Sequence, residues 1–304
     1  LAQPFEDIGN VHLIAFVIPG QHMHHQIDAK AVGEFALTFA ALALTLTPPL
    51  TARAAAKISL DRKTSRHCLK VLNEGFRSDE FWPSIHAAEA LTLSGYRKAV
   101  QKRLGPLLEA EKDDQKRCGL AREFARAGDS AKTRVMMKIL EGEDDYGKVH
   151  AAESLYKVGW VGSSDPLTKA FSTKGGDVRL RLMAAAALGK RGDAAALAFI
   201  RATLDGAEDP DIYRIAAWVL GRIGGAADCD AIRRRIPDAP DAVTKAFLEH
   251  ALAALGAADG KAALLRNLAS GDAMLRTYAA VFAGEIGMSE TKDQLIRQLD
   301  DANL

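Results

Sequence analysis

The sequence predicts an all-α solenoid, an array of helical hairpins stacked one after another. Three observations support this fold class: a motif that recurs about every 32 residues, an acidic residue at a fixed place in each copy, and apolar positions three or four residues apart. Repeats of this length indicate supersecondary units that stack to bury a shared core. Of the 304 residues, 48% are hydrophobic but only 6% are aromatic, a composition typical of closely packed helices. The formal net charge of +1 predicts no nucleic-acid partner for the whole molecule.

The N-terminal part of the chain predicts targeting. Residues 1–22 show no helical periodicity and carry no assignment. Residues 23–56 combine an apolar run at 36–50, too short to span a bilayer, with small residues around Arg53 that fit a signal-peptidase site. We interpret 23–56 as a secretory signal peptide and expect a periplasmic or secreted protein. Asp28 and Glu34 favour the alternative, a buried or interfacial helix in a cytoplasmic protein.

A glycine closes an alanine-rich segment in each of seven copies of the repeat. The intervals between these glycines are 33, 31, 33, 32, 32 and 31 residues, and segments such as VHAAESLYKVG and RIAAWVLGRIG align without gaps. Their apolar periodicity predicts two amphipathic helices per copy and a solenoid over 57–304. The closing glycines are Gly95, Gly128, Gly159, Gly192, Gly224, Gly256 and Gly287.

An acidic residue stands 15 positions before every closing glycine, and a base usually follows four residues later. At a helix start an aspartate can accept hydrogen bonds from the first-turn N–H groups, and its charge suits that end of the helix dipole. We expect the base to bond its own acid or that of the neighbouring repeat, as in an Asp177–Arg181 pair. The acids are Glu80, Asp113, Asp144, Asp177, Asp209, Asp241 and Asp272. The bases are Arg117, Lys148, Arg181, Lys245 and Arg276.

The repeat resembles the HEAT repeat. Its pattern, D-x-x-[VIL]-[RK]-x-x-A-A-x-x-L-G, is matched best by residues 209–212 and 221–224, and it is most similar to the short repeats of phycobilin-lyase-like proteins. The resemblance covers roughly 58–304 and implies a right-handed α-α superhelix of about seven hairpins, whose second helices line the concave face. Residues 300–304 look like the start of a second helix, so we expect the repeat array to be truncated at its C-terminus.

One register of the second helices predicts a partner-binding strip. This basic register, two residues before successive closing glycines, consists of Arg126, Lys157, Lys190 and Arg222. Trp218 lies one turn from Arg222, and Trp and Arg often dominate binding energy. The alternative is a solvated helix edge. The predicted surface, suited to an acidic segment of a protein partner, comprises Glu89, Arg122, Arg126, Glu153, Lys157, Lys190, Trp218 and Arg222.

Two histidine–carboxylate pairs invite comparison with metalloenzymes. His86 and Glu89 occupy the same repeat positions as His150 and Glu153, and each pair shares one helix face. HEAT-like di-iron hydroxylases use adjacent His-Glu pairs, whereas this chain has H-A-A-E, and two repeats separate the pairs by roughly 20 Å. We therefore expect no metal and no other cofactor. The three widely spaced cysteines likewise show no zinc or disulfide pattern.

Two classes of function fit this sequence. The first is a non-catalytic scaffold or accessory module that binds a protein on the concave face. The alternative is an enzyme or enzyme subunit, either bilin-lyase-like or a HEAT-type metalloenzyme, which would need a ligand-sized pocket or clustered histidines and carboxylates. We predict no catalytic residues, because no common nucleotide-binding or hydrolase motif occurs.

Overall fold

The computed structural model describes residues 60–160 and 162–301, and all regular structure in these ranges is helical. They contain fifteen α-helices and no strand, so the predicted all-α solenoid is confirmed. No helix in the described ranges has the length and apolar character needed to cross a membrane. The extension at 1–22 and the predicted signal peptide at 23–56 lie outside the described residues.

The described helices fall into two compact units, which we call the terminal unit (60–97 and 265–301) and the central unit (98–264). In the terminal unit α2 packs against α3, and Gln298 donates a hydrogen bond of 2.9 Å to the carbonyl of Leu268. Its helices are α2 (Arg62–Phe76), α3 (Phe81–Leu93), α15 (Ala273–Glu285) and α16 (Lys292–Gln298). The boundaries of the units fall at the start of α4 (Arg97–Ala110) and within α14 (Ala258–Leu268).

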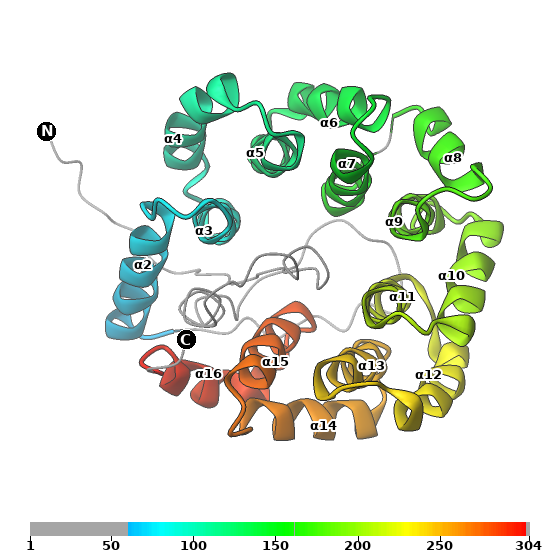
Figure 1. The fold of residues 1–304 in the computed structure, drawn as a ribbon. Coiled ribbons are helices and arrows are strands. Elements are labelled where there is room, and N and C mark those ends of the chain that lie inside the picture. The colour runs from blue at the N-terminus through cyan, green and yellow to red at the C-terminus, as the bar shows by residue number, and fades with distance from the viewer. Residues whose placement is uncertain (1–59, 161, 302–304) are drawn as a thin grey trace, which may run out of the picture. The chain divides into compact units, whose positions relative to one another are not determined.

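The central unit has two layers of helices (Figure 1). Its outer layer contains α4, α6 (Thr133–Leu140), α8 (Asp165–Ser172), α10 (Ala194–Gly206) and α12 (Cys229–Arg235). Its inner layer contains α5 (Asp114–Arg126), α7 (Asp145–Lys157), α9 (Val178–Gly189), α11 (Pro210–Ile223) and α13 (Ala242–Ala254). Each inner helix packs against the next inner helix and against at least one outer helix, as expected of stacked helical hairpins.

The ends of the inner helices follow the predicted register. Six of the seven predicted acids accept a hydrogen bond from a first-turn N–H group, whereas Glu80 makes no such bond. Six of the seven closing glycines have φ between 65° and 108°, a conformation that ends helices and strains other residues. Gly224 differs, with φ −77°, because Gly225 and a 3-10 turn follow it.

Small side chains let the inner helices approach one another closely. In α9 the run from Leu182 to Leu188 is buried, and four of its seven residues are alanines. A Cβ added at Gly221 of α11 would lie 2.8 Å from the Cα of Ala251 in α13. The alanine-rich composition thus sets the spacing of the inner layer.

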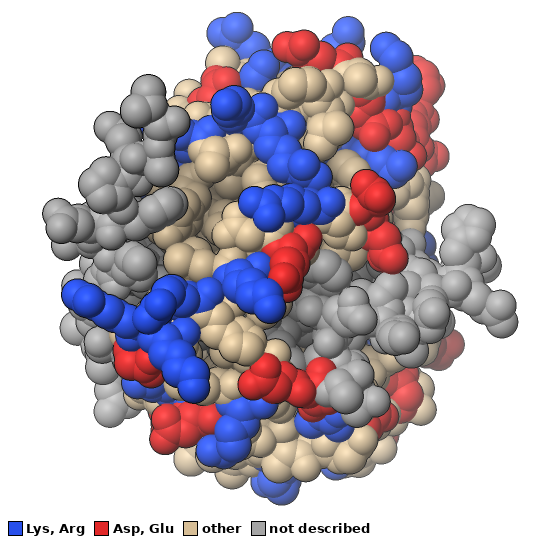
Figure 2. Space-filling model, turned by 90° about the vertical axis from the view of Figure 1, so that its left-hand side faces the viewer, with Lys and Arg blue, Asp and Glu red and all other residues tan. Residues whose placement is uncertain are grey.

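The outward face of α4 is basic. Val100 and Leu104 are buried, whereas Lys98, Lys102 and Arg103 are exposed. Figure 2 shows Lys and Arg side chains on this side of the molecule interspersed with Asp and Glu.

Candidate functional site

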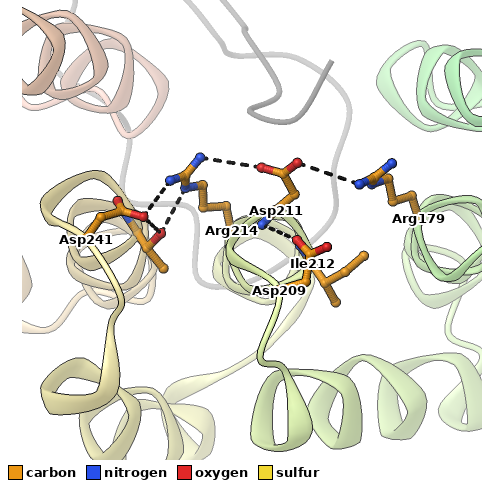
Figure 3. Close-up of polar contacts among 7 residues, drawn as sticks. Arg179, Asp209, Asp211, Ile212, Arg214 and Asp241 are labelled. Carbon is orange, nitrogen blue, oxygen red and sulfur yellow. Dashed lines mark hydrogen bonds and ion pairs between the residues drawn. The ribbon is translucent and has the colours of Figure 1, made fainter. Parts of the chain in front are cut away.

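An ion-pair ladder links the first turns of α9, α11 and α13 (Figure 3). The guanidinium of Arg179 lies 3.7 Å from Asp211, and Asp211 lies 3.5 Å from Arg214. Arg214 in turn donates to Asp241 at 2.7 Å and to the Thr244 hydroxyl at 2.9 Å. Each contact except the Arg214–Asp211 pair crosses between repeats, so the ladder holds three successive hairpins in register.

The predicted Asp177–Arg181 pair is wrong. Asp177 caps α9 by accepting a 2.7 Å bond from the backbone N–H of Arg179. Arg181 instead donates to the carbonyl of Phe171 at 3.1 Å, and its guanidinium lies 4.4 Å from the centre of the Phe199 ring. The arginine is drawn away because a carbonyl and an aromatic face of the outer layer offer a more buried contact than the exposed cap.

Other bases of the same register also find different partners. Arg117 pairs with Asp114 at 2.5 Å, one residue beyond the acid that caps its helix. Arg276 pairs with Asp301 at 3.0 Å, an acid that follows the last helix of the terminal unit. The cap positions are therefore regular along the array, whereas the ion pairs vary with the local packing.

A buried ion cluster occupies the C-terminal half of α5. Glu123 is completely buried and accepts a 2.9 Å bond from Arg122 and bonds of 2.6 and 2.8 Å from Arg126. Charged hydrogen bonds of this kind satisfy a carboxylate that burial would otherwise penalise. Arg122 and Arg126, both predicted to face a partner, are therefore engaged within their own helix.

A second buried group follows one repeat later on α7. Lys157 and Glu153 form an ion pair in which each side chain is only 5% exposed. Burial alone would raise the pKa of Glu153, but Lys157, His150 and Arg122 hold it below its ordinary value. Burial lowers the pKa of His150 to about 4, although Glu153 opposes this, so the imidazole is neutral at pH 7. The charge of Lys157 is thus compensated inside the protein.

The next two members of the basic register lie on aromatic rings. Tyr156 of α7 and Trp218 of α11 meet edge-to-face across α9, with ring centres 5.6 Å apart. The Lys190 ammonium lies 5.0 Å from the centre of the Tyr156 ring, and the Arg222 guanidinium lies 3.8 Å from that of Trp218. We call these four residues the cation–aromatic cluster. The sequence analysis did not single out Tyr156, because its contact with Trp218 depends on how closely α7 and α11 approach one another.

The cluster brings two positive charges close together. Lys190 is exposed and Arg222 is half-buried. Burial of the ammonium group and the nearby Arg222 charge both lower the pKa of Lys190. Arg222 also donates a 2.8 Å bond to the carbonyl of Trp218, which fixes the guanidinium over the ring. Attraction between a cation and the face of an aromatic ring holds each charged group in place.

The structure narrows the predicted eight-residue surface. Four of its members are buried and cannot offer an exposed contact, namely Glu89, Arg122, Glu153 and Trp218, and the side chain of a fifth, Lys157, is only 5% exposed. The reason is that their side chains are turned into the helical layers, where Glu89 lies 3.9 Å from His86 and Trp218 supports Arg222. The apolar anchor expected at Trp218 is therefore wrong as stated, because only 2% of this residue is exposed.

The described residues bring no metal ligands together. Within 60–160 and 162–301, no group of three or more His, Cys, Asp and Glu side chains is placed to hold a metal ion. His86 and Glu89 belong to the terminal unit, and His150 and Glu153 belong to the central unit. The cysteines at 68, 118 and 229 are free and buried, and burial raises the pKa of the Cys68 thiol to about 11.

Comparison with protein families agrees with the fold. Residues 173–253 match the family model described as HEAT repeats. The matched segment includes α9 to α13 and therefore the ladder, Lys190, Trp218 and Arg222. The match and the all-helical fold together support a HEAT-repeat protein; the finer likeness to phycobilin-lyase-like repeats stays a prediction. Comparison with curated proteins gives no significant match.

Proposed function

We propose that this protein is a non-catalytic HEAT-repeat scaffold that binds an acidic segment of a partner protein on the inner face of its central unit. The observation that carries the proposal is the cation–aromatic cluster, in which Lys190 and Arg222 lie close together over two joined rings. Solenoids commonly use the surface of stacked hairpins to hold an extended partner. Here two neighbouring cations, Lys190 and Arg222, mark that surface, although the whole chain is nearly neutral.

Carboxylates are the partner groups that this cluster fits best. A guanidinium can donate two parallel hydrogen bonds to a carboxylate, and a neighbouring ammonium adds a third donor. The mutual repulsion that lowers the pKa of Lys190 falls when an anion lies between the two cations. Binding an acidic side chain therefore relieves an unfavourable interaction already present in the unbound protein.

The cluster differs from the rest of the basic register. Arg126 and Lys157 already have buried carboxylate partners, Glu123 and Glu153, so replacing either cation weakens the compensation of a buried charge and mainly lowers stability. Lys190 and Arg222 lie on aromatic rings and donate to the backbone carbonyls of Tyr156 and Trp218. Partner binding is thus expected to depend on the second pair of cations.

Two short fluorescein-labelled peptides test the proposal by fluorescence anisotropy: one rich in Glu and Leu, and one with Lys in place of every Glu. The wild-type chain is compared with the double variant Lys190→Gln and Arg222→Gln. The charge-matched control replaces Arg134 and Lys138, both exposed on α6, by Gln. Circular dichroism and thermal melting show whether each variant folds.

The acidic peptide is expected to bind the wild type and the control equally, and the Lys190/Arg222 variant about tenfold more weakly, because each exposed ion pair contributes up to about fivefold. Added salt should weaken this binding, since exposed charges are screened over about 8 Å at physiological ionic strength. Equal affinity of all three proteins for the acidic peptide would show that the cluster is not the binding site.

A further inference from the structure

A second surface of the central unit lies in its outer layer, away from the cation–aromatic cluster. It is a groove of about 930 Å³ between α6 and α8, bounded by the first turns of α7 and α9. Its volume is in the range of pockets that hold a ligand, and it is partly open to solvent.

The local sequence explains the groove. The two flanking helices have eight residues each, whereas α4 and α10 have 14 and 13. They end before they cover the first turns of the inner helices, so Asp145 and Leu180 line the groove. The connecting loops contribute Gly142, Gly175 and Gly176, which add no side chains, and Gly175 adopts φ 75°.

The floor of the groove is apolar. Met137 and Leu140 contribute from α6, Pro166 and Ala170 from α8, and Leu180 from α9. Leu140 is buried, while the other four are only half-buried. A partly exposed apolar floor gains free energy when a partner's apolar side chain covers it.

The rim of the groove is acidic. Its four carboxylates are all exposed: Glu141, Asp145, Asp165 and Asp177. Lys148 on the rim is compensated by Asp145 at 2.9 Å, and Arg181 is directed to the Phe171 carbonyl and the Phe199 ring. Because Asp145 and Lys148 neutralise each other, the exposed rim keeps the three carboxylates of Glu141, Asp165 and Asp177 against the single exposed cation of Lys169, and its accessible charge is negative.

We propose that this groove binds a short segment of a partner protein in which apolar side chains are flanked by Lys or Arg. The apolar floor selects the apolar residues, and the acidic rim selects the flanking cations and suppresses acidic competitors. This surface does not depend on the cation–aromatic cluster and has the opposite charge preference. A single chain could thus hold two segments of opposite charge, one on each layer of its central unit.

The test uses the Lys–Leu peptide as its probe, with the Glu–Leu peptide as the control of opposite charge. One variant, Ala170→Trp, fills the groove from α8. A second variant, Glu141→Lys with Asp165→Lys, reverses two exposed rim charges without changing the floor. The matched control reverses two exposed acids of another repeat, Asp205→Lys with Glu208→Lys.

The Lys–Leu peptide is expected to bind the wild type and the control, and to bind each groove variant about tenfold more weakly or not at all. The Lys190/Arg222 variant should bind it like the wild type, which separates this inference from the proposed function. The inference is overturned if the wild type binds neither peptide, if it binds both equally, or if the rim reversal has no effect. It is also overturned if sedimentation shows a dimer that the groove variants lose, since the occupant would then be a second copy of the chain.

Discussion

Replacing Arg214 by Met should destabilise the central unit by about 2–3 kcal/mol. The side chain is only 11% exposed, and Met keeps most of its apolar length while removing all its donors. The lost bond to the buried Thr244 hydroxyl contributes about 1 kcal/mol, as does the bond to the partly exposed Asp241. The loss of the ion pair with Asp211 adds a fraction of a kcal/mol. Asp211 is only 10% exposed, and in the variant its remaining ion-pair partner is Arg179, at 3.7 Å.

The loss of stability in Arg214→Met should become smaller as the pH falls. Burial alone would raise the pKa of Asp241, but the hydrogen bonds from Thr244 and the charge of Arg214 hold it below its ordinary value. A carboxylate whose folded pKa is lowered adds stability that is present above its unfolded pKa, about 3.9, and is lost as pH falls through the folded pKa. The difference in stability between the wild type and Arg214→Met is therefore largest near pH 7 and shrinks below about pH 4.

Thermal and urea unfolding followed by circular dichroism measure this difference. A loss of 2–3 kcal/mol corresponds to a Tm lower by about 5–10 °C for a domain of this size. Arg234→Met is the matched control, because Arg234 is exposed on α12 and its replacement should change stability by less than about 0.5 kcal/mol. The ladder would have no structural role if the two variants unfolded at the same temperature at pH 7.

Three further predictions follow from other features. Gly260→Ala should lower the free energy of unfolding by about 1–3 kcal/mol, because a Cβ there would collide with the backbone of α13. Gly206→Ala should leave the free energy of unfolding unchanged, because there is open space around this glycine. Asp209→Ala should lower the free energy of unfolding by about 1 kcal/mol, because α11 loses its N-terminal cap, and it should leave the binding of both peptides unchanged. Urea titration measures the stability, and fluorescence anisotropy measures the binding. We also propose that the native protein is exported and begins near Ala55 or Lys57; N-terminal sequencing that finds residues 36–54 retained would contradict this.

The sequence predicted those features that depend on local structure. A cap such as Asp209 needs only a short polar side chain at a helix start, and a closing glycine needs only a left-handed backbone. Both recur at fixed positions in the sequence because each repeat begins and ends its second helix at the same place. The fold class followed from these positions and from the helical periodicity between them.

Features that depend on how different helices pack against one another could not be predicted in the same way. Arg181 was expected to join its cap residue, but the outer helices place the Phe171 carbonyl and the Phe199 ring nearer. Trp218 was expected at the surface because of its place in the repeat, yet its exposure depends on how closely α7, α9 and α11 approach one another. The groove between α6 and α8 was also missed, since it depends on the lengths of helices whose ends are poorly marked in the sequence.

The contact between Tyr156 and Trp218 has a consequence for cooperativity. In an ordinary repeat array each hairpin touches only its nearest neighbours, and the total stability is a sum of single-repeat and adjacent-pair energies. Here a ring on α7 meets a ring on α11 across the intervening hairpin, which adds an energy shared by three repeats. If α11 unfolds first, α7 loses its contact with Trp218 and becomes less stable even while α9 is still folded. We therefore expect α7, α9 and α11 to unfold together.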